Sequence, residues 1–214
     1  MLGVIPASSV VDVGCGVGTW LSVFQDFGVK EILGIEGDWV PKKYLVIPEN
    51  LFLNHDLSKP LILNRTFNLA ISLEVAEHIP ASSAKLFVDT LTSLAPAVLF
   101  PAAIPGQGGI GHVNEQWPDY WIEMFVQKGY RPFDVIRRKV WNDKRVAWWY
   151  SQNTLLFIKK ESYQTILLNI DATQSDEQSM LRIIHPGNYE NVLKRSTWSF
   201  ILKKTIKGIL NLKR

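Results

Sequence analysis

The sequence predicts an α/β protein built on a doubly wound, mainly parallel sheet. Short apolar runs of strand length alternate with segments whose apolar residues recur at helical spacing. A glycine-rich turn joins the first run to the first helix, and open α/β sheets bind ligands at that edge. Five strand–helix units followed by two closing strands account for residues 10–159.

The first unit is an apolar strand over residues 10–13, which contains Asp12. It leads into a turn made of Gly14, Cys15, Gly16, Val17 and Gly18. Because glycine has no Cβ, such a turn can bring backbone N–H groups close to a ligand, and a helix starting near residue 19 adds further donors. The dinucleotide fingerprint would need glycine where the chain has Thr19, so NAD becomes the less favoured ligand. A plain strand-to-helix connection is the alternative.

The next two strands also end at acids. Residues 31–35 form a short apolar run followed by Glu36, which lies 22 residues after Gly14. In nucleotide-binding units an acid at about this offset accepts hydrogen bonds from ribose hydroxyls, although a surface loop acid is the alternative. A third run over residues 50–53 precedes Asp56, whose alternative role is to form a turn.

The fourth strand is a nearly continuous apolar run over residues 67–73, which fits a parallel strand covered on both faces. It is followed by Glu74, Glu77 and His78, of which the last two either begin the next helix or line a site. The remaining pattern predicts helices over 82–94 and 120–128, a strand over 97–100, and β-rich runs over 131–140 and 154–159.

Two of these motifs resemble those of class I S-adenosylmethionine-dependent methyltransferases. Val-Asp-Val-Gly-Cys-Gly-Val-Gly at 11–18 resembles the first motif of this family, and Leu-Glu-Val-Ala-Glu-His-Ile-Pro at 73–80 resembles the fourth. The resemblance covers residues 1–160. It implies a Rossmann-like seven-stranded sheet of order 3-2-1-4-5-7-6 with strand 7 antiparallel, and S-adenosyl-L-methionine as cofactor.

The resemblance also implies a set of cofactor-binding residues. Glu36 would hold the ribose, Asp56 would accept a hydrogen bond from the adenine amine, and Glu74 would lie at the methionine end. The full predicted set is Asp12, Gly14, Cys15, Gly16, Gly18, Glu36, Asp56 and Glu74.

The methyl acceptor is expected under residues 101–121. The stretch at 105–112 is too rich in glycine for regular structure and follows the fifth strand, so we interpret it as an acceptor lid. His112 at its end is the candidate general base for a hydroxyl acceptor, because imidazole titrates near neutrality; the alternative is a histidine that only hydrogen-bonds the loop. Tryptophans between 117 and 150 either stack on a sugar or pack the core.

Composition limits the remaining possibilities. The chain has 214 residues and a net charge of +3, with no apolar run of membrane-spanning length and no cleavable signal pattern. Its one cysteine, Cys15, excludes an intramolecular disulfide, so we expect a cytoplasmic protein. No Cys/His cluster has metal-ligand spacing, so no metal is expected. Without a nucleic-acid module, the expected acceptor is a small molecule or a glycan.

The resemblance implies a methyltransferase domain over 1–160, and we expect a linker with a basic amphipathic extension over 161–214. Residues 191–214 carry seven cations and no acid. This tail can lie at a membrane interface, pack on a partner protein or cover its own domain. Two other functions remain open for the domain, namely a nicotinamide oxidoreductase and a cofactor-binding interaction module without catalysis.

Overall fold

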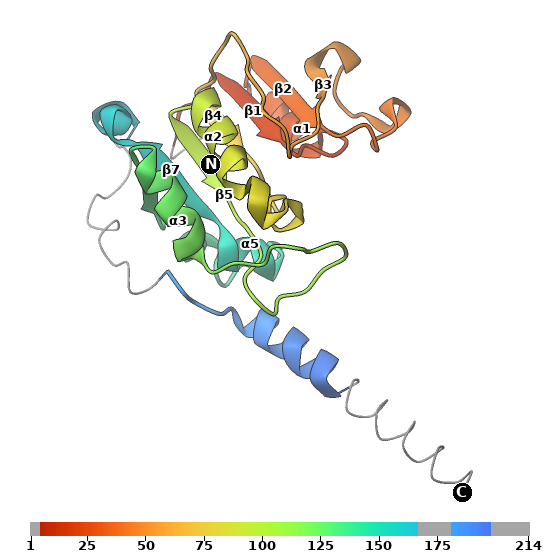
Figure 1. The fold of residues 1–214 in the computed structure, drawn as a ribbon, viewed down its shortest axis with the longest axis vertical. Helices are drawn as coiled ribbons and strands as arrows, with labels where there is room; N and C mark the ends of the chain where they lie inside the picture. The colour runs from red at the N-terminus through yellow and green to blue at the C-terminus, as the bar shows by residue number, and fades with distance from the viewer. Residues whose placement is uncertain (1–4, 167–180, 198–214) are drawn as a thin grey trace, which may run out of the picture.

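The computed structural model describes residues 5–166 and 181–197 (Figure 1). It contains a seven-stranded sheet of order β3-β2-β1-β4-β5-β7-β6. The strands are β1 (Ser9–Val13), β2 (Glu31–Glu36), β3 (Phe52–Asn54), β4 (Leu69–Ile71), β5 (Ala97–Phe100), β6 (Tyr130–Phe133) and β7 (Leu155–Lys159). Strands β1 to β5 are parallel, and β7 pairs antiparallel with both β5 and β6. The predicted fold class and strand order are confirmed.

Helices cover both faces of this sheet. The α-helices are α1 (Thr19–Asp26), α2 (Ala84–Leu94), α3 (Pro118–Gln127), α4 (Arg137–Val140), α5 (Trp148–Asn153) and α6 (Tyr163–Ile166), and a further helix spans 186–197. Short 3-10 helices are η1 (Lys42–Tyr44), η2 (Glu49–Leu51), η3 (Ala76–His78), η4 (Ala81–Ser83) and η5 (Lys160–Ser162). No helix in the described ranges is long and apolar enough to cross a membrane.

The core consists of two apolar clusters, one on each face of the sheet. On one face, alternate strand residues such as Val11 and Val98 pack against Phe87 of α2 and Phe125 of α3. Figure 1 shows α2 and α3 together over this face. On the other face, Val10 and its neighbours pack against α1. Burial on both faces explains why the strands read as continuous apolar runs.

The expected β-rich run over 131–140 is only partly correct. Strand β6 ends at Phe133, and Arg137–Val140 is helical. The buried Arg137 makes two 2.8 Å hydrogen bonds to the carboxylate of Asp134, which lies one helical turn earlier. It also donates to the carbonyl oxygens of Gln152 and Leu181. These tertiary contacts override the local β propensity of the segment.

The segment after residue 180 packs on the domain. The backbone N–H of His185 and the side-chain amide of Asn188 both donate to Oε1 of Gln152, at 2.9 and 3.0 Å. Arg195 donates to the carbonyl oxygen of Gln107 at 2.8 Å, and Figure 1 shows the loop after β5 reaching this helix. The described part of the basic tail therefore contacts its own domain, whereas residues 198–214 lie outside the described part.

Candidate functional site

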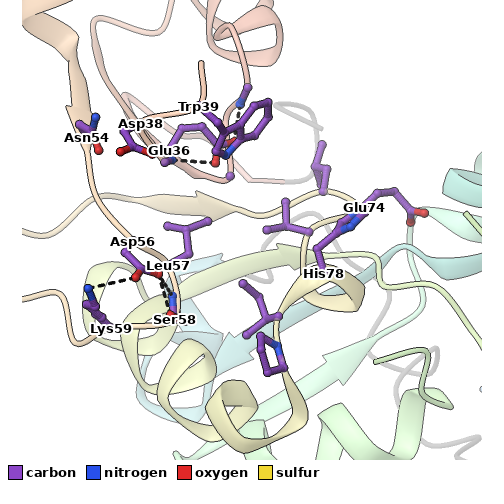
Figure 2. Close-up of a pocket in the computed structure, with 17 residues that line it drawn as sticks. Glu36, Asp38, Trp39, Asn54, Asp56, Leu57, Ser58, Lys59, Glu74 and His78 are labelled. Atoms are coloured by element: carbon purple, nitrogen blue, oxygen red, sulfur yellow. Dashed lines mark hydrogen bonds and ion pairs between the residues drawn. The ribbon is translucent and has the colours of Figure 1, made fainter. Parts of the chain in front are cut away.

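A cavity of about 850 Å³ lies where β1, β2, β3 and β4 end (Figure 2). It is lined by Gly14, Gly16, Glu36, Gly37, Asp38, Trp39, Asn54, Asp56, Leu57, Ser58, Lys59, Leu73, Glu74, Val75, His78, Ile79 and Pro80. Five of the eight predicted cofactor residues are on this wall. The carboxyl ends of parallel strands meet at one edge, which is why residues from 14 to 80 converge here.

The glycine turn serves both packing and access to the cavity. Gly14 has a φ of 91°, and a Cβ there would lie 2.3 Å from Cγ2 of Val75. Gly16 has a φ of 54°, and a Cβ there would meet nothing within 4 Å, because this glycine opens toward the cavity. Only glycine adopts both conformations without strain.

Glu36 fixes the turn at the end of β2. Its carboxylate accepts a 3.0 Å hydrogen bond from the backbone N–H of Gly16 and a 2.9 Å bond from that of Gly37. The residue is only 6% exposed, yet it lines the cavity. Since a carboxylate has about four lone-pair sites, two backbone donors leave Glu36 able to accept further hydrogen bonds from a ligand.

Asp56 lies on the opposite wall and forms a turn. Its Oδ1 accepts from the backbone and hydroxyl of Ser58, at 3.0 and 2.6 Å, and its Oδ2 lies 3.2 Å from Nζ of Lys59. The hydrogen bond from the Ser58 hydroxyl is the main cause that lowers the pKa of Asp56 to about 2. The turn role is observed, and a contact with adenine stays a prediction.

Asp12, Cys15 and Gly18 do not line the cavity. Asp12 is 2% exposed within β1; burial, and then the charge of Glu36, raise its pKa well above the ordinary value. Burial likewise raises the pKa of Cys15, whose side chain packs beside Gly34. A Cβ at Gly18 would lie 2.7 Å from Ile47. In this structure all three residues are buried and pack inside the protein instead of facing the cavity.

Among the wall residues outside the predicted set are three with polar or aromatic side chains at strand ends, namely Asp38, Trp39 and Asn54. Asp38 and Trp39 follow the end of β2, and Asn54 ends β3. Their position at or just past the end of a strand was the sequence signal available for all three.

Glu74 separates this cavity from a second one. It has a φ of 57°, which is rare for a residue other than glycine and tends to occur at functional sites. Its carboxylate accepts from the side-chain amides of Asn153 and Gln107, at 3.1 and 3.2 Å. Figure 2 shows it turned away from Glu36. Burial, and then the charge of Glu77, raise the pKa of Glu74 to about 8.

The second cavity measures about 330 Å³ and contains the predicted base, His112. Its lining is Glu74, Glu77, His78, Gln107, Gly108, His112, Trp148, Trp149 and Asn191. Glu74 and His78 line both cavities. The second cavity therefore adjoins the first at the end of β4.

The glycine-rich loop is folded around one acid. Glu115 accepts hydrogen bonds from the backbone N–H groups of Gly106 and Gly108, at 2.8 and 2.6 Å. Its Oε1 also lies 2.8 Å from Nδ1 of His112. A Cβ at Gly109 would lie 2.2 Å from Nε2 of His112, so the glycine leaves room for the ring. This places His112 inside the cavity, 4.0 Å from Glu77.

Comparison with known proteins finds one matching family model and several similar solved structures. A family model described as a methyltransferase domain matches residues 5–155. Among solved structures, Streptomyces venezuelae DesVI has 16% identity and a TM-score of 0.53, covering 74% of this chain and 86% of its own. The methyltransferase domain of bacterial CtHen1-C has 18% identity and a TM-score of 0.51, covering 72% and 90%.

The YcgJ protein of Bacillus subtilis has 15% identity and a TM-score of 0.46; the match covers 59% of this chain and 63% of that protein. No curated protein matches the chain. At these identities, the two solved structures with TM-scores above 0.5 support the fold alone.

Proposed function

The chain belongs to the class I S-adenosylmethionine-dependent methyltransferases, and we propose that it methylates an oxygen atom of a small-molecule or glycan acceptor. The observation that carries this proposal is the pair of adjoining cavities, which share Glu74 and His78. Methyl transfer is an in-line displacement, so donor and acceptor must meet across such a boundary.

The larger cavity has the donors and acceptors that the cofactor requires. When bound, S-adenosylmethionine supplies a methyl group on a positively charged sulfur. Glu36 can accept hydrogen bonds from the ribose, and the open face at Gly16 lets the backbone approach the ligand. A cavity of about 850 Å³ falls within the usual range for small-ligand sites. The residues present therefore fit this cofactor.

The smaller cavity has the groups that an oxygen acceptor requires. The acceptor hydroxyl must lose its proton as its oxygen forms the bond to the methyl carbon and the sulfur–carbon bond breaks. His112 lies in this cavity as the predicted base, and such a base typically contributes about 10²–10⁴ in rate. Trp148 and Trp149 offer aromatic surface on which a sugar can stack.

We propose the loop over residues 101–121 as the acceptor lid. It supplies Gln107, Gly108 and His112 to the smaller cavity. The hydrogen bond from Arg195 to the Gln107 carbonyl connects it to the C-terminal helix. Opening the lid would break the hydrogen bonds that join Gln107 to Glu74, Asn153 and Arg195, together with those from Val113 and Asn114 to the Glu77 carbonyl. Such a closed loop would exclude water during transfer and open for substrate exchange.

A transfer screen tests this function. Purified protein is incubated with radiolabelled S-adenosylmethionine and a panel of hydroxylated small molecules, glycans, amines and thiols. The proposal expects label on a hydroxyl acceptor and its loss in His112→Gln, with His55→Gln retaining transfer. Exclusive transfer to nitrogen or sulfur would overturn the choice of acceptor atom. Cofactor binding without transfer to any class would favour an interaction module.

A further inference from the structure

We propose that Glu77, His78 and His112 bind a divalent transition-metal ion at the edge of the smaller cavity. The proposal rests on the proposed function, because it places the ion where the acceptor is expected. Each of the three side chains offers one ligand atom, and all three atoms lie within 4.8 Å of one another. Nε2 of His112 lies 4.0 Å from Oε1 of Glu77.

The distances between the three ligand atoms are close to those in a site that holds a metal ion. Ligand atoms about 2.1 Å from a tetrahedral cation lie about 3.4 Å apart. The three atoms therefore need to converge by at most about 1.4 Å, which is within the reach of small side-chain rotations. One carboxylate and two imidazoles form a common catalytic metal set, which leaves positions open for water or substrate.

The carboxylate of Glu77 is an independent indication of a missing partner. Glu77 is 0% exposed, and neither of its side-chain oxygens has a partner at normal hydrogen-bond distance in the described part of the protein. The nearby Glu74 carboxyl and the backbone at Glu77 and Ala103 partly offset the rise in the Glu77 pKa that burial causes, but none of them is a cation. Buried carboxylates are otherwise paired, hydrogen-bonded or bound to a metal. A cation between Glu77 and the two rings would satisfy this group.

Both imidazoles are already oriented as metal ligands usually are. Nδ1 of His112 lies 2.8 Å from Oε1 of Glu115, which accepts hydrogen bonds elsewhere in the loop. Nδ1 of His78 lies 3.2 Å from the carbonyl oxygen of Gly111, which can only accept. Donation from Nδ1 leaves the lone pair on Nε2 in each ring. Carboxylates and carbonyls on the second ring nitrogen are the typical partners of metal-binding histidines.

Backbone hydrogen bonds hold the loop that carries His112 against η3, which carries Glu77 and His78. The N–H groups of Val113 and Asn114 both donate to the carbonyl oxygen of Glu77, at 2.8 and 3.0 Å. This holds His112 over η3 even though it lies 34 residues after His78. The distance along the chain explains why ligand spacing in the sequence gave no metal prediction.

The ion changes the role of His112 in the proposed reaction. An acceptor oxygen bound at an open position would be acidified by the cation, and its proton would leave to solvent water. His112 would then act as a ligand instead of taking the proton itself. Imidazole ligands favour zinc and cobalt over magnesium, so the site should discriminate between these ions.

Cobalt binding to the tag-free full-length chain tests the proposal without cofactor or acceptor. We expect one Co²⁺ per chain, seen as visible absorption bands, displaced by Zn²⁺ and not by a similar concentration of Mg²⁺. Glu77→Gln and His112→Ala should each weaken binding at least 30-fold. Glu115→Gln should weaken it about 10–100-fold, the usual effect of losing an outer partner. His55→Gln should bind as the wild type does.

His78→Ala keeps the test decisive if the Glu77 and His112 variants fold poorly, because the His78 side chain is exposed. It should also weaken Co²⁺ binding. Absence of Co²⁺ and Zn²⁺ binding, or binding that survives these substitutions, would overturn the site. S-adenosylmethionine binding is measured on the same samples: if it persists while metal binding is absent, the metal proposal fails and the methyltransferase assignment does not.

Discussion

The two cavities differ in how their residues are distributed along the chain. The wall of the larger cavity comes from residues 14–80, mostly from turns that directly follow β1 to β4. The smaller cavity combines η3 with the loop after β5, with α5 and with Asn191. The larger cavity is formed by local sequence motifs. The smaller cavity forms only because segments far apart in the sequence pack together.

The two cavities also differ in how their acids are held. Glu36 and Asp56 each accept at least two hydrogen bonds. Burial raises the pKa of Glu77 in the smaller cavity and of Glu74, which lines both cavities, and the Glu77 carboxylate has no partner at normal hydrogen-bond distance in the described residues. Glu36 and Asp56 are thus hydrogen-bonded before a ligand binds, whereas the Glu77 carboxylate has no partner at normal hydrogen-bond distance among the described residues. Perturbed acids of this kind are typical of reacting centres.

The largest expected effect separates the cavities by function. His112→Ala should lower turnover by about 10²–10⁴, because both its proposed roles, base and metal ligand, act on the acceptor proton. Its affinity for S-adenosylmethionine should stay within twofold of wild type. Steady-state kinetics and calorimetry on the same sample measure both. A parallel loss of cofactor affinity would contradict the division of labour between the cavities.

Gly14→Ala tests the rigid wall of the larger cavity. The new Cβ would lie 2.3 Å from Val75 at a positive φ, so we expect about 2–4 kcal/mol of lost stability from overpacking and backbone strain. Gly28→Ala is the matched control, because its φ is 92° and its Cβ would meet nothing within 4 Å. It should lose only about 1–2 kcal/mol. Equal losses in urea unfolding would argue against the close contact with Val75.

The sequence predicted those parts of the fold and site that depend on local motifs. The glycine turn and Glu36 were found because they follow a strand within one local motif. The segment that forms helix α4 was predicted to be β-rich because the hydrogen bonds from Arg137 to the carbonyl oxygens of Gln152 and Leu181 are tertiary contacts. The grouping of Glu77, His78 and His112 depends on how the loop folds back over η3, for which local periodicity carries no signal.

A smaller effect on stability is expected from Asp12, the buried acid in β1 that precedes the glycine turn. Asp12 has a raised pKa in the folded protein, so the folded state binds more protons than the unfolded chain above about pH 4. Its cost to stability therefore grows as pH rises. Asp12→Asn should leave stability unchanged near pH 4 and raise it by at least about 1 kcal/mol at pH 8 without cofactor. Destabilisation at pH 8 would show that the carboxylate is favourably held.

The smallest effect is expected at the C-terminal helix. Arg195→Ala removes the donor to the Gln107 carbonyl at the edge of the smaller cavity. Because Arg195 is exposed, stability should change by no more than about 0.5 kcal/mol. The acceptor KM should rise about two- to fivefold, about 0.4–1 kcal/mol, with cofactor affinity unchanged. Lys194→Ala, which removes the neighbouring cation, should leave KM unaltered.

The central claim is that the larger cavity holds S-adenosylmethionine through Glu36. Calorimetric titration of the wild-type protein, Glu36→Gln and the exposed control Glu49→Gln tests it directly, with NADH run in parallel. We predict one cofactor per chain, affinity reduced at least tenfold in Glu36→Gln because one acceptor becomes a donor, and no change in Glu49→Gln. Binding of NADH in place of S-adenosylmethionine, or full affinity in Glu36→Gln, would contradict the claim.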